Sequence, residues 1–139
     1  MQTILEIIRK AGGWHHGLYL KIDNPPYMEL VIEATDESGP CGLPAISVAY
    51  YGERNGDMMR RPEMLFELGR GSNRTFFLDP FYWRNDFVGT DQHSRFIADG
   101  HYVVSDEVYE RHIRFAEEWD NVLRTQDLVS AFVSRRDSR

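Results

Sequence analysis

The fold of this chain is decided by residues 46–68, ISVAYYGERNGDMMRRPEMLFEL. Two strand-like runs with alternating apolar residues flank the dipeptide Asn55-Gly56. An Asn-Gly pair between such runs is the strongest short-range signal for a β-hairpin, because both residues tolerate a positive φ. Pro62 lacks the backbone donor that a strand ladder uses, so it marks a bulge, a strand start or an edge. The stretch therefore predicts an antiparallel hairpin with an irregular segment over residues 58–61.

Further strands are predicted on both sides of this hairpin. Apolar and polar residues alternate over residues 18–22 and over residues 28–35, and an Asn-Pro-Pro turn separates the two runs. This period of two is typical of half-buried strands, which should pair with each other. Another strand starts at residues 75–78, and Pro80 is expected to interrupt it. Residues 88–100 are expected to form a loop.

Helices are predicted at both ends of the chain. Residues 3–10 place three isoleucines on one helical face, and two glycines then end the helix. Ser105 is a good N-cap for a long helix over residues 106–125, which carries acidic residues in its first turn and a wide apolar stripe. A shorter amphipathic piece follows at residues 128–133, and the arginine-rich tail 134–139 is predicted to be disordered.

These elements predict a single α+β domain over residues 1–139. A short N-terminal helix precedes an antiparallel meander of four or five strands, and the long C-terminal helix packs on one face of that sheet. The other face is expected to be at least partly wet. By the alternation, this wet face presents Tyr19, Lys21, Glu29, Val31, Glu33, Ser47, Tyr51, Leu65 and Glu67.

The composition indicates which kind of binding partner and which cellular compartment to expect for this protein. The chain has 16 Lys and Arg against 22 Asp and Glu, a net charge of −6, which argues against a broad nucleic-acid-binding surface. The only cysteine, Cys41, has no partner within the chain, which favours a reducing compartment. No apolar run approaches a membrane span, and the first residues do not resemble a secretion signal. The prediction is a cytoplasmic protein that does not enter a membrane.

The strongest candidates for a binding surface lie in the hairpin and in the aromatic segment 76–87. Aromatic residues next to arginine are typical of protein interface hot spots, and also of base-stacking platforms. The net acidity favours a protein partner or a homodimer. The competing interpretation is a second small core beneath the loop 88–100. The predicted partner-binding residues are Tyr51, Arg60, Arg61, Trp83, Arg84 and Phe87.

Catalytic signals are weaker. Asp57 and Glu63 are the carboxylates that a divalent cation could use for hydrolysis, but no lysine or histidine lies between them. Asp57 is explained more simply as a turn residue. The five histidines show no recognisable metal spacing, and no nucleotide-binding or nucleophile motif is present. No cofactor and no metal site are predicted, and the chain is more consistent with a binding protein than with an enzyme.

Several segments of the chain carry a resemblance to known sequences: NPPYM at 24–28, LVIE at 30–33, ISVAYY at 46–51, NGD at 55–57, PEM at 62–64, NDFVG at 85–89 and FAEEWD at 115–120. Through these segments the chain resembles a family of small bacterial domains of unknown function that look like accessory genes of plasmids and other mobile elements. The likeness covers roughly residues 17–126, and it implies an accessory role, related to host defence or to conjugation. No activity is established for that family, so no functional residue is carried over.

Two functions therefore follow from the sequence. The first is a non-enzymatic module that binds a macromolecular partner through the sheet face or the aromatic segment. The second is a metal-dependent hydrolase or nuclease that uses the hairpin carboxylates.

Overall fold

The structure is a computed structural model that describes residues 1–137, apart from the side chains of residues 53, 54, 74 and 135–137. The class is α+β, as predicted, but the sheet is larger than the expected four or five strands. Six antiparallel strands form the main sheet in the order β1-β2-β3-β4-β5-β6, and β7 and β8 form a separate hairpin. The helices and strands are α1 (Gln2–Lys10), β1 (Tyr19–Ile22), β2 (Glu29–Ala34), β3 (Ala45–Arg54), β4 (Asp57–Arg70), the 3₁₀ turn η1 (Ser72–Arg74), β5 (Phe76–Asn85), β6 (Thr90–His93), β7 (Arg95–Ala98), β8 (His101–Val104), α2 (Asp106–Thr125) and α3 (Leu128–Asp137).

The central hairpin, β3–β4, forms at the predicted turn. Asn55 and Gly56 have φ values of 52° and 85°, the left-handed pair that a two-residue hairpin turn needs. The predicted irregular segment 58–61 is wrong, because β4 begins at Asp57 and pairs with β3 through this region. A shift of register between Ala49 and Tyr51 of β3 accommodates Pro62, so the irregularity is a bulge within a continuous strand.

Two other expectations about the middle of the chain are corrected. Pro80 does not interrupt β5, which pairs with β4 on both sides of a register shift between Leu65 and Phe66. The unpaired residue of this bulge is Phe81, next to Pro80, which is paired with Phe66 although it lacks a backbone donor. The expected loop 88–100 instead contains β6 and β7, and β8 follows.

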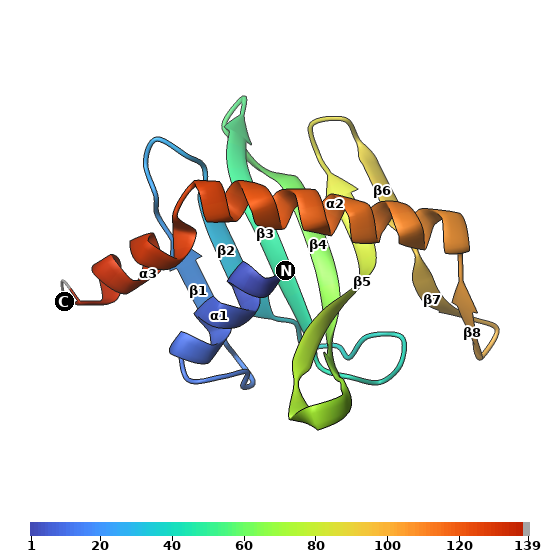
Figure 1. Ribbon diagram of the computed structural model, residues 1–139. Coiled ribbons are helices and arrows are strands. Elements are labelled where there is room, and N and C mark those ends of the chain that lie inside the picture. Colours follow the sequence, from blue (N-terminus) through green and yellow to red (C-terminus); the bar gives the residue numbers. More distant parts are fainter. Residues whose placement is uncertain (138–139) are drawn as a thin grey trace.

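One face of the sheet carries the helices. Figure 1 shows α1 and α2 on the same side of the sheet, with α2 crossing the strands. Side chains from both helices and from the facing side of the sheet form a continuous apolar core. Its fully buried members include Ile4, Ile7, Leu30, Ile32, Ile46, Val48, Met64, Phe66 and Leu123. We call this side the helix-bearing face, and the opposite side the outer face.

The C-terminal helices agree closely with the sequence. α2 has Ser105 as its N-cap residue and two acidic residues in its first turn. α3 begins at Leu128 and extends to Asp137. The described part of the tail 134–139 is therefore helical, and residues 138 and 139 lie outside the described residues. Within residues 1–137, no helix is both long enough and apolar enough to cross a bilayer.

Candidate functional site

Five of the six predicted partner-binding residues meet at one end of the sheet. Figure 1 shows the β3–β4 turn and the β5–β6 turn extending past α2 at this end. The strand register places Tyr51 opposite Arg60, and Arg84 opposite Glu63. We call this region the arginine–aromatic end, and it consists of Tyr51, Arg60, Arg61, Arg84 and Phe87.

Backbone and side-chain bonds join β4 to the turn that follows β5. The amide of Arg60 donates to Asp86 Oδ2 at 2.8 Å, and the amide of Asp86 donates to the carbonyl of Arg60 at 2.9 Å. The guanidinium of Arg84 forms an ion pair with Asp86. Burial alone would raise the pKa of Asp86, but the hydrogen bonds from the Arg60 amide and from Arg84 outweigh it and lower that pKa. The Asp86 carboxylate therefore stays charged and holds this end of the sheet in one arrangement.

On the outer face of this end, the polar side chains have hydrogen-bond or ion-pair partners within the domain. Arg60 Nε lies 3.4 Å from the hydroxyl of Tyr51 and 3.5 Å from Glu63 Oε1. The hydroxyl of Ser47 donates to Glu63 Oε2 at 2.6 Å. Glu63 is only 8% exposed, so its two partners position it rather than leave it free for chemistry.

Phe87 and Arg61 form a stacked pair at the same end. The Arg61 guanidinium carbon lies 4.5 Å from the centre of the Phe87 ring, which is close enough for a cation–π interaction. Phe87 lies over Gly52, where an added Cβ would meet the ring at 3.5 Å. Because Gly52 follows Tyr51, the ring is on the helix-bearing side. Asn85 Oδ1 accepts a hydrogen bond from the backbone amide of Phe87 at 3.0 Å, and this bond fixes the turn between β5 and β6.

Arg61 is exposed and forms no ion pair with any residue whose side chain is described. The other two arginines of this end are engaged with carboxylates. A stacked but uncompensated guanidinium is ordered in advance and still has its donors available. That combination is suited to binding a carboxylate of a partner.

Trp83 does not belong to the arginine–aromatic end. It pairs with Met64 across the strands, on the helix-bearing face, and packs against Phe115 of α2 with ring centres 5.9 Å apart. Trp83 was predicted to bind a partner together with the other five residues, but the structure places it apart from them. Its ring contributes to the core, because it alternates with Tyr82 and Arg84 along β5.

The two candidate catalytic carboxylates are not brought together. Asp57 is exposed beside the β3–β4 turn, whereas Glu63 is buried six positions further along β4. At ~3.3 Å per residue, this spacing separates them by about 20 Å along the strand. Among the side chains that the structure describes, no three histidine, cysteine or carboxylate groups converge as a metal site would require.

Sequence reasoning missed a buried ion pair between β4 and β7. Arg95 Nη1 lies 2.7 Å from Glu67 Oε1, and the two side chains are 3% and 1% exposed. Glu67 was expected on the wet face. It does point to the outer face, but the loop before β3 covers it, and Cys41 and Leu43 donate their amides to Oε2 at 2.9 and 3.2 Å. Gly39 passes so near that an added Cβ would lie 2.1 Å from Glu67 Cγ.

Comparison with known proteins gives a family without an assigned activity. Residues 2–129 match a family described as a domain of unknown function, DUF6908. No curated protein matches the chain. No solved structure matches it either. Since the match covers most of the sequence, the chain belongs to the DUF6908 family of domains of unknown function.

Proposed function

We propose that this domain is a non-enzymatic module that binds a protein partner through the arginine–aromatic end. The observation that carries the proposal is the Arg61–Phe87 stack, in which the guanidinium lies 4.5 Å from the ring and forms no ion pair with a side chain that the structure describes. Arginine and aromatic residues are enriched in protein interfaces and dominate their hot spots. Tyr51, Arg60 and Arg84 lie at the same end of the sheet on its outer face, where their polar groups are already positioned by one another and by Glu63 and Asp86.

The chemistry of the site favours an acidic segment of a protein as the partner. Arg61 has no carboxylate partner among the described side chains, and a carboxylate of a partner can accept two parallel hydrogen bonds from a guanidinium. Nucleic acid is disfavoured as a partner by the net charge of −6. A second copy of the chain is the alternative protein partner. An accessory role on bacterial mobile elements, exercised in the cytoplasm and related to host defence, is part of this proposal and rests on the resemblance alone.

Charge reversal at Arg61 is expected to remove the partner without unfolding the domain. A tagged Arg61→Glu variant, used to capture proteins from a lysate of the native host at physiological salt, should retain roughly tenfold less partner than the wild type. Arg61 is exposed, so the thermal midpoint should change little.

Arg70→Glu is the matched control for this experiment. Arg70 is also exposed and lies over a phenylalanine ring, that of Phe76, at 5.5 Å. This variant should capture the partner as well as the wild type, and nuclease treatment should not release it. Equal loss in both variants would mean that overall charge, not the arginine–aromatic end, governs capture. Retention by Arg61→Glu would contradict the proposal.

The alternative function, metal-dependent hydrolysis by Asp57 and Glu63, receives less support from the geometry. A metal ion that binds the native state must raise the thermal midpoint. We expect no shift with millimolar magnesium, manganese or zinc in the wild type or in Asp57→Asn. A rise in the wild type that Asp57→Asn abolishes would instead favour the hydrolase.

A further inference from the structure

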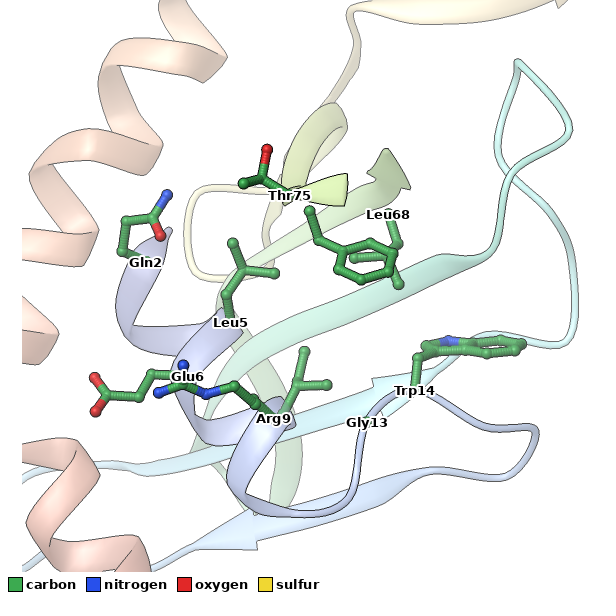
Figure 2. A pocket seen from close by; sticks show the side chains of 10 residues that line it. Gln2, Leu5, Glu6, Arg9, Gly13, Trp14, Leu68 and Thr75 are labelled. Atoms are coloured by element: carbon green, nitrogen blue, oxygen red, sulfur yellow. The ribbon is translucent and has the colours of Figure 1, made fainter. Parts of the chain in front are cut away.

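A second candidate site lies at the opposite end of β4, between α1 and the β4–β5 hairpin. Here a pocket of about 880 Å³ opens on the helix-bearing face. Its apolar walls are formed by Leu5 and Ile8 of α1, Trp14, Leu68 and Phe76. Figure 2 shows Leu5 pointing from α1 toward Leu68 and Thr75, with Trp14 at the side of the pocket. A volume of this size is in the range of small-molecule sites.

The pocket leaves an aromatic side chain in contact with solvent. Phe76 is 50% exposed although it lines an apolar wall. The hairpin end that carries Phe76 extends beyond the rest of the sheet (Figure 1), and α2 does not cover it. An apolar ligand that filled the pocket would bury this ring and gain the free energy of removing it from water.

The charged side chains around the pocket indicate what charge a ligand should carry. Arg9 lines it from α1, and Arg70 lies over the Phe76 ring on the other wall. Neither arginine forms an ion pair within the described part of the chain. Glu6 is the one carboxylate in the lining, and in Figure 2 its carboxylate and the guanidinium of Arg9 both point away from Trp14. Arg70, over the ring of Phe76, is the cation beside the apolar wall, and it favours a ligand with an apolar body and an anionic head.

We propose that this pocket binds a small amphipathic carboxylate, with its hydrocarbon or aromatic body against Leu5, Trp14 and Phe76 and its carboxylate toward Arg70. The pocket is separate from the arginine–aromatic end. Arg61 and Arg70 are nine positions apart on β4, which corresponds to about 30 Å. The site can therefore exist whether or not a protein partner binds at the other end.

Dodecanoate is a suitable probe, and dodecanol is its uncharged counterpart. By titration calorimetry or by displacement of a fluorescent naphthalene sulfonate, the wild type should bind dodecanoate more tightly than dodecanol. Phe76→Ala should weaken dodecanoate binding by about tenfold, because it removes one wall of the pocket. Arg70→Gln should weaken the binding of dodecanoate by roughly threefold and leave the binding of dodecanol unchanged.

Phe77→Ala provides the matched control. Phe77 is the next residue and is 43% exposed, but it does not line the pocket and instead packs over Gly69. The Phe77→Ala variant should bind both probes as the wild type does. The thermal midpoints of Phe76→Ala and Phe77→Ala should show that each variant is folded. Equal binding by Phe76→Ala and the wild type, or no binding by the wild type, would overturn the proposal. So would a dimer in sedimentation that only Phe76→Ala dissociates, because the pocket would then hold a second copy of the chain.

Discussion

Arg95→Met is expected to lower the free energy of unfolding by about 3–5 kcal/mol, the usual cost of removing one partner from a buried ion pair. The substitution keeps a side chain of similar length but leaves the Glu67 carboxylate charged, with 1% exposure. The desolvation of that carboxylate is then no longer compensated by a cation.

The effect should be large because Arg95 joins three parts of the fold. Its Nε donates to the carbonyl of Pro80 and its Nη2 to the carbonyl of Asp79, each at 3.0 Å. Its Nη1 donates to Glu67 and to the hydroxyl of Tyr102. Burial alone would lower the pKa of Arg95, but the hydrogen bonds with Tyr102 and Glu67 outweigh it and raise that pKa. Loss of Arg95 should therefore loosen the contact of β7–β8 with the sheet.

Urea denaturation of two comparison variants tests this explanation. Lys21→Met removes an exposed ion pair with Glu29 and should cost less than about 1 kcal/mol. The double variant Glu67→Leu/Arg95→Met should regain part of the stability, because no buried charge is left without a partner. If Arg95→Met cost no more than Lys21→Met, the buried pair would not contribute as described.

The second large effect is a loss of stability in acid that depends on His112. This side chain is 3% exposed, its Nδ1 lies 2.9 Å from the hydroxyl of Ser94, and its Nε2 has no hydrogen-bond partner among the described residues. Burial, with smaller contributions from Arg111 and His93, lowers the pKa of His112 to about 4. The folded protein therefore keeps the imidazole neutral at pH values where the unfolded chain binds a proton.

The sign of this pH effect on stability follows from proton linkage. The unfolded chain takes up a proton near pH 6.5, and the folded state takes it up only near pH 4. Stability that is present above pH 6.5 is thus lost as the pH falls toward 4. Protonation of His112 should therefore lower the free energy of unfolding by about 2–3 kcal/mol between pH 6.5 and pH 4.

Urea unfolding at pH 7 and at pH 4.5 measures this loss. His112→Gln, which cannot be protonated, should lose less stability between the two pH values than the wild type does. Carboxylates with lowered pKa, such as Asp86 and Asp120, also destabilise the fold in acid, but they act equally in both proteins. An identical loss in the wild type and His112→Gln would show that His112 is not responsible.

The parts of the fold that were predictable have strong local signals. Asn55-Gly56 specifies the hairpin turn through positive φ values, and Ser105 with the following apolar stripe specifies α2. β6 is polar throughout, and β7 and β8 show no alternation of apolar and polar residues, whereas β1 is equally short but does alternate. Pro62 and Pro80 suggested interruptions, but bulges keep the strands continuous around both residues.

The candidate sites were predictable to different degrees. Residue types alone grouped Arg61 and Phe87, and tertiary structure does place them in contact. They did not reveal that Trp83 faces the core, because the register shift in β5 was not visible in the pattern. The Glu67–Arg95 pair joins residues far apart in the chain, and the pocket needs α1 beside the β4–β5 hairpin. Neither of these long-range contacts has a signature in a single sequence.

Backbone amide hydrogen exchange of the captured complex locates the partner on the fold. If the arginine–aromatic end holds the protein partner, exchange should slow in residues 58–61 and 84–89 when the partner binds, and Arg61→Glu should strongly reduce both the complex and this protection. Protection confined to α1 and residues 68–77, or to the exposed side of α2, would contradict the account.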